Sequence, residues 1–444
     1  MNFENLKKSD PTCYNLVLEE IERQETSLEL IPSECIASLS VIEALGSPFT
    51  NKYSEGYAKK RYYGGNEVVD EVELLAIERV KKAFPGVAHA NVQAYSGSPA
   101  NMAVLNALCN VGDTIMGLAL SQGGHLTHGH MVSATAKFFN AVQYGLDKDG
   151  YINIEEVEAL AREHKPKVII VGFTAYSREF PFKEFARIAD EVGAYLLADI
   201  SHISGLVVSG VHTSPAPYAD VIMTTTHKTL RGPRGALIMT TEKGLQKDSE
   251  LANKIDKSVF PGLQGGPHNH QTLAIAVALG EALTPEYREI NTQIVKNAKT
   301  LASELINHGF ELATGGTDNH LLLMSTGKGR GQYMQEALDL AGITLNKNTI
   351  PNEPCSPFNP SGIRMGTPIM TMRGMKEDEM IQVAAWIKRV ADAIFEFEYV
   401  EDKDTRVVRL KEFKEFIKNN EEIAKIRAEV KELCLKFPIY SFKG

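Results

Sequence analysis

The chain has 444 residues, of which 43% are hydrophobic and 23% are charged. This ordinary globular composition excludes disorder, collagen and coiled coil as descriptions of the whole chain. With a formal net charge of −9, the chain lacks the positive field of a dedicated nucleic-acid binder, so we expect no nucleic-acid partner. No apolar run reaches the ~20 residues that cross a bilayer, and the N-terminus has no signal-peptide stretch. We therefore expect a cytoplasmic protein without a membrane partner.

The five cysteines are odd in number, and no two of them form a CxxC pair. This pattern argues against both a disulfide framework and a structural zinc site.

Short apolar runs alternate with amphipathic stretches from about residue 68 to 241. The patterns predict helices at 68–84, 99–109 and 182–192, and strands at 88–93, 114–120, 168–173, 194–200 and 221–226. Gly193 is a suitable C-cap for the helix at 182–192. The alternation predicts a mainly parallel sheet covered on both faces, with ligands beyond the carboxyl ends of its strands.

The C-terminal part of the chain follows a different pattern. It predicts helices at 267–283 and 285–307, then short strands at 319–324, 343–345 and 362–366. We predict two domains: residues 1–280 with an N-terminal arm and the large domain, and residues 281–444 as a smaller α+β domain. Residues 13–25 predict an isolated amphipathic helix whose apolar face needs a partner, such as another subunit.

Polar residues follow two of the predicted strands. Asp199 ends the strand at 194–200, and Lys228 follows the strand at 221–226 within the run Thr224 to Lys228. A lone aspartate of this kind is usually a cap, and a lone lysine is usually solvated. Together, Lys228 can form a Schiff base with pyridoxal phosphate, and Asp199 can pair with its pyridinium nitrogen.

Ser96, Gly97 and Ser98 lie between a predicted strand and a predicted helix. Free amides at that helix N-terminus suit a phosphate, but a serine N-cap explains the same residues equally well. The glycine-rich stretch 327–331 lacks the spacing of a P-loop, so we interpret it as a surface turn.

Three histidines, His125, His128 and His130, lie close together in the sequence. No nearby carboxylate or cysteine completes a metal shell, so we expect no metal. An imidazole stacked on the cofactor ring is the better use of one of them.

The run TTTHKTLRGPRG resembles the cofactor-lysine signature of the serine hydroxymethyltransferase family, also called glycine hydroxymethyltransferases. The runs TNKYSEGY, KRYYGGNE, ANVQAYSGSPAN, GGHLTHG, FPGLQGGPHNH, GGTDNHL, LNKN and SGIRMGTP resemble that family too, in the family's order, across roughly residues 28 to 375. The resemblance implies an α/β fold of the aspartate-aminotransferase type, with a mainly parallel, seven-stranded sheet in the large domain. It also implies active sites shared across a homodimer, which the sequence does not distinguish from a tetramer.

The resemblance also implies a role for each matching residue. Catalytic roles fall to Lys228, Glu55, His227 and Asp199. Cofactor contacts fall to His202, His125 (stacked on the ring), Ser96, Gly97, Ser98, Thr174, Tyr53, Gly265 and Gly266. Arg364 would hold the substrate carboxylate, with Ser33, Tyr63 and Glu55 nearby. The folate would lie against Leu120, Gly124, Leu126, Asn346, Ser356, Pro357 and Phe358. The neighbouring subunit would supply Tyr53, Glu55, Tyr63, Gly265 and Gly266.

The sequence departs from the family pattern in a few places. Cys35 replaces an asparagine near Ser33, Thr174 replaces a serine, and Ser201 and Ser204 replace alanines. None of these changes removes a group that the mechanism needs.

The resemblance implies reversible transfer of the serine hydroxymethyl group to tetrahydrofolate, giving glycine and 5,10-methylenetetrahydrofolate through an aldimine on Lys228. Glu55 is the leading proton-transfer residue. The alternatives are a folate-independent aldolase for threonine-like substrates, an enzyme with another acceptor substrate such as α-methylserine, and a binding protein that kept the fold.

Overall fold

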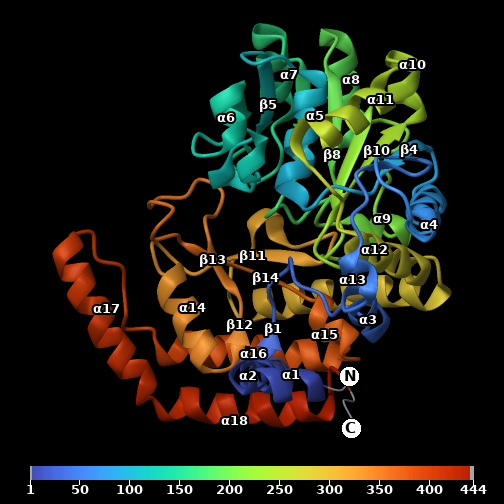
Figure 1. Cartoon of the computed structure of the whole chain (residues 1–444). Coiled ribbons are helices and arrows are strands. Elements are labelled where there is room, and N and C mark those ends of the chain that lie inside the picture. Colours follow the sequence, from blue (N-terminus) through green and yellow to red (C-terminus); the bar gives the residue numbers. More distant parts are fainter. Residues whose placement is uncertain (1–2, 441–444) are drawn as a thin grey trace. The chain divides into compact units, whose positions relative to one another are not determined.

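The computed structural model describes residues 3–440, and the chain divides into two compact units (Figure 1). One unit is continuous, Ala37–Thr292, and the other combines the chain up to Ile36 with the chain from Gln293 onward. This division differs from the predicted domains 1–280 and 281–444 in two ways. It falls inside helix α13 (Pro285–Asn307), and it assigns the N-terminal segment to the C-terminal unit.

A seven-stranded sheet forms the centre of the continuous unit. Its strands, in spatial order, are β4 (Val87–Asn91), β10 (Ala236–Thr241), β9 (Val221–Thr225), β8 (Tyr195–Asp199), β7 (Val168–Val171), β5 (Thr114–Leu118) and β6 (Asn140–Tyr144). β10 runs antiparallel to both of its neighbours, and all the other pairs are parallel. The predicted, mainly parallel sheet is confirmed, whereas β6 and β10 had no predicted counterpart.

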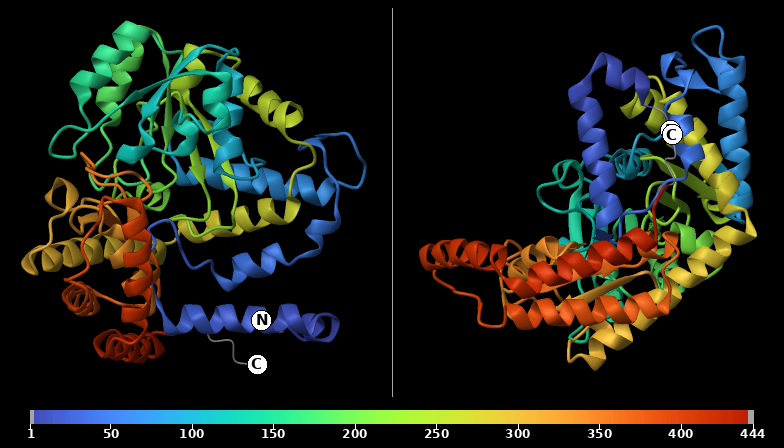
Figure 2. Two further views of the ribbon diagram at one scale, coloured as in Figure 1. Left: turned by 90° about the vertical axis from the view of Figure 1, so that its left-hand side faces the viewer. Right: turned by 90° about the horizontal axis from the view of Figure 1, so that it is seen from below.

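Helices cover both faces of this sheet (Figure 2). α5 (Gly97–Leu108) and α11 (Leu251–Lys257) bury their apolar residues against one set of alternating strand residues, which includes Ile170 and Leu197. α7 (Ile154–His164) and α8 (Phe182–Val192) pack against β6, β7 and β8. α8 has the predicted bounds, because Gly193 adopts the left-handed φ of +74° that ends it.

The remaining elements of this unit are α3 (Leu39–Leu45), η1 (Pro48–Asn51), β2 (Gly56–Tyr57), β3 (Lys60–Arg61), α4 (Glu67–Ala83), η2 (Leu120–Gln122), η3 (Leu126–His128), α6 (Ala134–Phe138), α9 (Ser204–Val208), α10 (Glu242–Lys247), η4 (Ser258–Leu263) and α12 (Asn269–Ala282). α12 packs against α3 and α4, and a small core of Val41, Ala44, Ala274 and Ala278 joins α12 to α3.

The second unit is α+β. Its elements are α1 (Glu4–Ser9), α2 (Pro11–Thr26), β1 (Leu28–Glu29), most of α13, η5 (Ala313–Gly315), β11 (Leu321–Ser325), α14 (Gly331–Leu340), β12 (Ile343–Thr344), β13 (Asn346–Asn348), β14 (Gly362–Gly366), α15 (Pro368–Met372), α16 (Glu377–Ala393), α17 (Lys403–Lys418) and α18 (Glu421–Lys436). β11, β14 and β13 form an antiparallel sheet, and β1 pairs in parallel with β12. One continuous hydrophobic core fills this unit and includes Leu28 of β1.

The amphipathic helix predicted at 13–25 lies within α2, which packs against α18 of the same unit. The Arg373 guanidinium secures the end of α2 by donating to the carbonyls of Gln24, Glu25 and Ser27 at 2.8–3.2 Å. Leu16 and Leu18 of α2 nevertheless remain 58% and 42% exposed in the single chain.

Candidate functional site

Asp199 and Lys228 lie at neighbouring strand ends of the seven-stranded sheet. Asp199 is the last residue of β8, and Lys228 lies shortly after β9. β8 and β9 are parallel, with Asp199 opposite Met223, so both residues lie at the carboxyl edge. They line one small pocket together with Gly97, Asn101, His125, His128, Phe173, Thr174, Ser201, His202, Met223 and Thr225.

The Asp199 carboxylate is buried and accepts four hydrogen bonds. Oδ2 accepts from the Asn101 amide at 2.9 Å and lies 3.0 Å from Nε2 of His128. Oδ1 accepts from the backbone N–H of Ser201 at 3.1 Å and from its hydroxyl at 2.6 Å. Burial alone would raise the pKa of Asp199, but the bonds and charges around it outweigh burial and hold that pKa below its ordinary value. An ionised carboxylate therefore faces the pocket.

A chain of hydrogen bonds fixes the His125 ring. The Asn101 amide also donates to the Thr127 hydroxyl at 2.8 Å, and that hydroxyl lies 2.8 Å from Nδ1 of His125. The backbone N–H of Thr127 donates to the same nitrogen at 3.2 Å, so Nε2 carries the proton of the neutral ring. Burial lowers the pKa of His125 to about 4, so this ring is uncharged at neutral pH.

The N-terminus of α5 opens beside this pocket. The helix starts at Gly97, two residues earlier than predicted, and Ser96 occupies the N-cap position without a side-chain capping bond. A Cβ on Gly97 would lie 2.7 Å from the Thr225 side chain, so only glycine allows this close approach. The capping explanation of Ser96 therefore lacks its hydrogen bond, and the first amides of α5 suit an anion.

His227 and His202 flank the lysine segment. Burial, together with the charges of Arg234 and Lys228, lowers the pKa of His227 to about 3. His202 is buried, and its backbone carbonyl accepts a 2.9 Å hydrogen bond from the Thr229 hydroxyl. His202 lines the pocket, whereas His227 is not among its lining residues.

Three of the predicted folate residues surround a tight loop after β5. Leu120 begins η2, Leu126 begins η3, and Gly124 lies between them. A Cβ on Gly124 would lie 1.9 Å from the Leu118 carbonyl oxygen, so the loop requires glycine there. The Thr174 hydroxyl lies 3.0 Å from the Gly124 carbonyl and so ties this loop to the chain after β7.

The residues expected from a neighbouring subunit form a separate cluster in the continuous unit. The rings of Tyr53 and Tyr63 meet edge to face at 5.5 Å, and the Tyr63 hydroxyl donates to Glu55 at 3.3 Å. Gly265 and Gly266 lie against Glu55 and Tyr53. None of the five residues lines the pocket that holds Asp199 and Lys228 of the same chain.

Arg364 and Asn346 lie on paired strands of the second unit. They face each other across β13 and β14, and Nε of Arg364 donates to Oδ1 of Asn346 at 3.0 Å. Burial lowers the pKa of Arg364 to about 10, which still leaves the guanidinium charged at neutral pH. Ser33 lies in the N-terminal segment of this same unit, shortly after β1.

A loop between β13 and β14 carries Ser356, Pro357 and Phe358, and Phe358 is 82% exposed. The Glu353 carboxylate holds this loop together by accepting from the backbone N–H groups of Ile350 (3.2 Å), Cys355 (3.0 Å) and Ser361 (2.8 Å) and from the Ser361 hydroxyl (2.5 Å).

Comparison with known proteins agrees with this arrangement. Residues 6–387 match the family model described as serine hydroxymethyltransferase. A serine hydroxymethyltransferase of Acidothermus cellulolyticus is 56% identical over 392 residues, which cover 88% of this chain and 90% of that protein. The chain belongs to the serine hydroxymethyltransferase family.

Serine hydroxymethyltransferases use pyridoxal phosphate, with tetrahydrofolate as co-substrate. The pocket fits pyridoxal phosphate, because it combines an ionised carboxylate, a lysine amine, a neutral imidazole and an open helix N-terminus. Oδ1 of Asn101 is buried there and has no hydrogen-bond partner among residues 3–440, a condition expected where a ligand or water completes a site.

Sequence reasoning did not identify Asn101, Thr127 or the contact between His128 and Asp199. These residues act on Asp199 and His125 through tertiary hydrogen bonds, which no local pattern encodes. The one available signal was position, since Asn101 follows the predicted phosphate loop and Thr127 and His128 follow His125.

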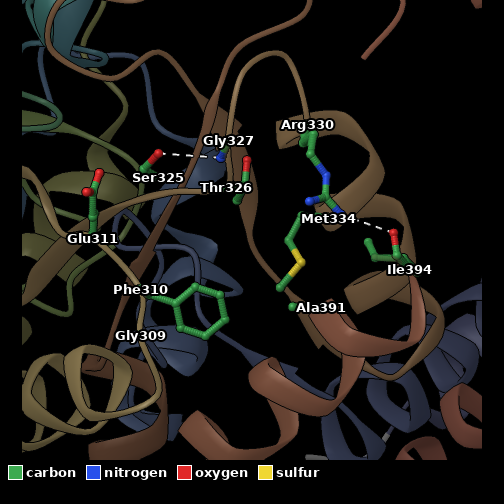
Figure 3. Close-up of a pocket in the computed structure, with 10 residues that line it drawn as sticks. All are labelled: Gly309, Phe310, Glu311, Ser325, Thr326, Gly327, Arg330, Met334, Ala391 and Ile394. Carbon is green, nitrogen blue, oxygen red and sulfur yellow. Dashed lines mark hydrogen bonds between the residues drawn. The ribbon is translucent and has the colours of Figure 1, made fainter. Parts of the chain in front are cut away.

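A larger cavity of about 340 Å³ lies within the second unit, apart from the residues predicted to bind cofactor or substrate (Figure 3). Phe310 and Met334 give it apolar walls, Glu311 adds a carboxylate, and Arg330 adds a guanidinium that donates to the Ile394 carbonyl at 3.0 Å. Its turn, Gly327 to Gly331, is the glycine-rich stretch predicted as a surface turn. Because Glu311 and Arg330 bring opposite charges to this cavity, its lining favours no single class of ligand.

Within residues 3–440, no group of three or more His, Cys, Asp and Glu side chains is placed to hold a metal ion. None of the five cysteines, all of which lie within these residues, forms a disulfide. No helix in that same range is long and apolar enough to cross a membrane.

Proposed function

We propose that this protein transfers the hydroxymethyl group of serine reversibly to tetrahydrofolate, giving glycine and 5,10-methylenetetrahydrofolate. Its family membership supports this reaction. The structural observation that carries the proposal is the pocket in which Asp199, held ionised, lies with Lys228 at adjacent strand ends. When bound, pyridoxal phosphate supplies an aldehyde that reacts with amines and a ring that accepts electrons from the substrate.

The residues of the continuous unit would hold the cofactor. The amine of Lys228 would attach it, Asp199 would pair with the ring nitrogen, and the neutral His125 ring would stack on the ring face. Ser96, Gly97 and Ser98 would bind the phosphate at the N-terminus of α5. Further contacts would come from Thr174 and His202. His227 stays uncharged beside Lys228 and so adds no positive charge next to that amine.

The second unit would bind the substrate carboxylate through Arg364, assisted by Ser33. A guanidinium offers two parallel donors to a carboxylate, a geometry that an amine cannot match. Asn346, Ser356, Pro357 and Phe358 of this unit, and Leu120, Gly124 and Leu126 of the continuous unit, would contact the folate.

Glu55 would move the proton during transfer to folate. The decisive experiment measures two activities on one preparation of Glu55→Gln: serine conversion to glycine with tetrahydrofolate, and cleavage of a β-phenyl or β-methyl substrate without it. General acid–base catalysis is commonly worth ~100- to 10,000-fold, so folate-dependent turnover should fall by about that factor. The folate-independent cleavage should fall much less.

Glu43→Gln is the matched control, because Glu43 is an exposed carboxylate on α3. It should leave both activities unchanged. Wild-type protein that converts serine equally well without tetrahydrofolate would contradict the proposed function and favour a folate-independent aldolase. Equal losses of both activities in Glu55→Gln would instead assign Glu55 a general role at the cofactor.

We also propose that the enzyme acts in the cytoplasm as a homodimer with shared sites. The cluster of Tyr53, Glu55 and Tyr63 supports this assembly, because it lies outside the pocket of its own chain and exposes Tyr53 by 59% and Tyr63 by 48%. The exposed Leu16 and Leu18 of α2 are a second apolar surface that a partner could cover.

A further inference from the structure

The hydroxyl of Ser201 makes the shortest hydrogen bond to Asp199, at 2.6 Å from Oδ1. It also accepts from the backbone N–H of Thr225 at 3.0 Å and lies 3.9 Å from Sδ of Met223. A hydroxyl has one proton, and a charged carboxylate at 2.6 Å is a far stronger acceptor than a sulfur at 3.9 Å. That proton therefore points to Asp199.

The orientation of Asp199 does not depend on this hydroxyl. The backbone N–H of Ser201 holds Oδ1, while Asn101 and His128 hold Oδ2. What the hydroxyl adds is a strong donor that draws negative charge toward itself. A carboxylate that already serves several donors offers less charge to the next one, since all of them share the same lone pairs.

We propose that the Ser201 hydroxyl acts through Asp199 and limits the negative charge that this carboxylate presents to the cofactor ring. The inference rests on the proposed function, in which Asp199 pairs with the ring nitrogen. By resemblance, Ser201 stands where the family has alanine, so the donor is a feature of this chain rather than of the fold.

The chain provides a matched control three positions away. Ser204 also replaces an alanine of the family, and it is fully buried in α9. Unlike Ser201, its hydroxyl has no hydrogen-bond partner within the described residues. Ser201→Ala and Ser204→Ala therefore delete the same group from similar surroundings, but only the first deletes a donor to Asp199.

The experiment compares holoenzymes loaded with pyridoxal phosphate, using cofactor release, thermal unfolding and the ¹⁵N chemical shift of a ¹⁵N-labelled cofactor ring. Ser201→Ala should release the cofactor about 3- to 10-fold more slowly, because part of the strength of a charge-assisted bond passes to the ring nitrogen. Its ring ¹⁵N shift should move toward the unprotonated value, because a carboxylate with one donor fewer has a higher pKa and draws the shared proton toward itself.

Thermal stability should move in the opposite direction. Ser201→Ala leaves the Thr225 N–H without its acceptor, and a buried, unpaired donor lowers stability, so the melting temperature should fall. A residue with a merely structural role would lower the melting temperature without slowing cofactor release. Ser204→Ala should match the wild type in cofactor release and in ring ¹⁵N shift, and its melting temperature should not fall, because it removes a hydroxyl that is already unpaired within the described residues.

Cofactor release at the wild-type rate or faster in Ser201→Ala, or an unchanged ¹⁵N shift, would overturn the proposal. Asp199→Asn separates this failure from failure of the underlying assignment. It should release the cofactor at least ten times faster, about 1.4 kcal/mol of lost binding or more. An unchanged rate in Asp199→Asn would overturn the role of Asp199 itself, and the role of Ser201 with it.

Discussion

The proposed role of Arg364 uses both its charge and the planar shape of its guanidinium. Arg364→Lys would keep the charge but lose the two-point contact with the substrate carboxylate that we propose for this residue. We expect the KM for serine to rise about 10- to 100-fold, because that factor corresponds to the loss of one charge-assisted hydrogen bond. The change in kcat should be smaller. Steady-state kinetics measure both constants. Arg330→Lys, in the separate cavity, should leave the KM unchanged, and an unchanged KM in Arg364→Lys would place the substrate carboxylate elsewhere.

The low pKa of His227 predicts that the stability of the folded protein depends on pH. Its pKa in the folded protein is about 3, below the ordinary value of 6.5, so the unfolded chain binds a proton between those pH values and the native state does not. Stability is therefore lost as the pH falls from about 6.5 toward 3, by at most about 1.4 kcal/mol per pH unit from this residue.

His227→Gln removes the contribution of this histidine to the loss of stability at low pH. Its melting temperature should fall less than that of the wild type between pH 7 and pH 5, as calorimetry of the holoenzymes would show. His164→Gln, which changes an exposed histidine on α7, should keep the wild-type slope. Parallel curves for His227→Gln and wild type would contradict the expectation.

At the scale of elements, one carboxylate, that of Glu353, joins four donors of the loop between β13 and β14. Glu353→Gln removes the charge that four donors share, and an amide cannot accept from all of them equally well. We expect the KM for tetrahydrofolate to rise about tenfold, as the loss of one such bond would give, while the KM for serine changes little.

The control for the loop is Glu432→Gln, which alters an exposed ion pair on α18 and should change neither KM. An equal rise of both KM values in Glu353→Gln would mean that the loop affects the whole active site rather than the folate alone.

Elements with strong local signals were predicted from the sequence. α8 has the predicted bounds because its apolar periodicity and Gly193 specify the same end. The start of α5 was missed because Gly97 and Ser98, poor helix formers, are held in the helix by close packing on Thr225. β6 was not identified, because NAVQY is a partly exposed edge strand without a continuous apolar run.

In the site, too, features with a local sequence signal were predicted and features that depend on tertiary contacts were not. Asp199 and Lys228 were predictable because parallel strands bring their carboxyl ends to one edge. Asn101 was not, because its two donated bonds reach Thr127 and Asp199, far from it in sequence. The N-terminal segment was assigned to the wrong neighbours for a similar reason: β1 pairs with β12, and no local signal reveals a partner so distant.

For the whole molecule, shared sites predict complementation between two inactive variants. Lys228→Ala and Glu55→Gln subunits, mixed at random, give heterodimers in half of the cases. In each heterodimer, one of the two sites would combine an intact lysine from one subunit with an intact glutamate from the other. Co-expression should therefore restore about a quarter of the wild-type activity.

Each variant expressed alone is the control and should have little activity. No recovery in the mixture, with heterodimers demonstrated by differently tagged subunits, would show that Glu55 serves the site of its own chain. Sedimentation of a fully active monomer would contradict the shared site directly.

The pairing of β1 with β12 has a consequence for how the chain is made. Leu28 and Leu30 are fully buried in the core of the second unit, and Leu28 lies opposite Ile343. During synthesis, β1 therefore leaves the ribosome about 300 residues before its partner β12, while the continuous unit, Ala37–Thr292, can fold in between. The apolar residues of β1 remain unpaired until β12 has been made, so nascent chains that stop short of β12 should be the species most dependent on chaperones.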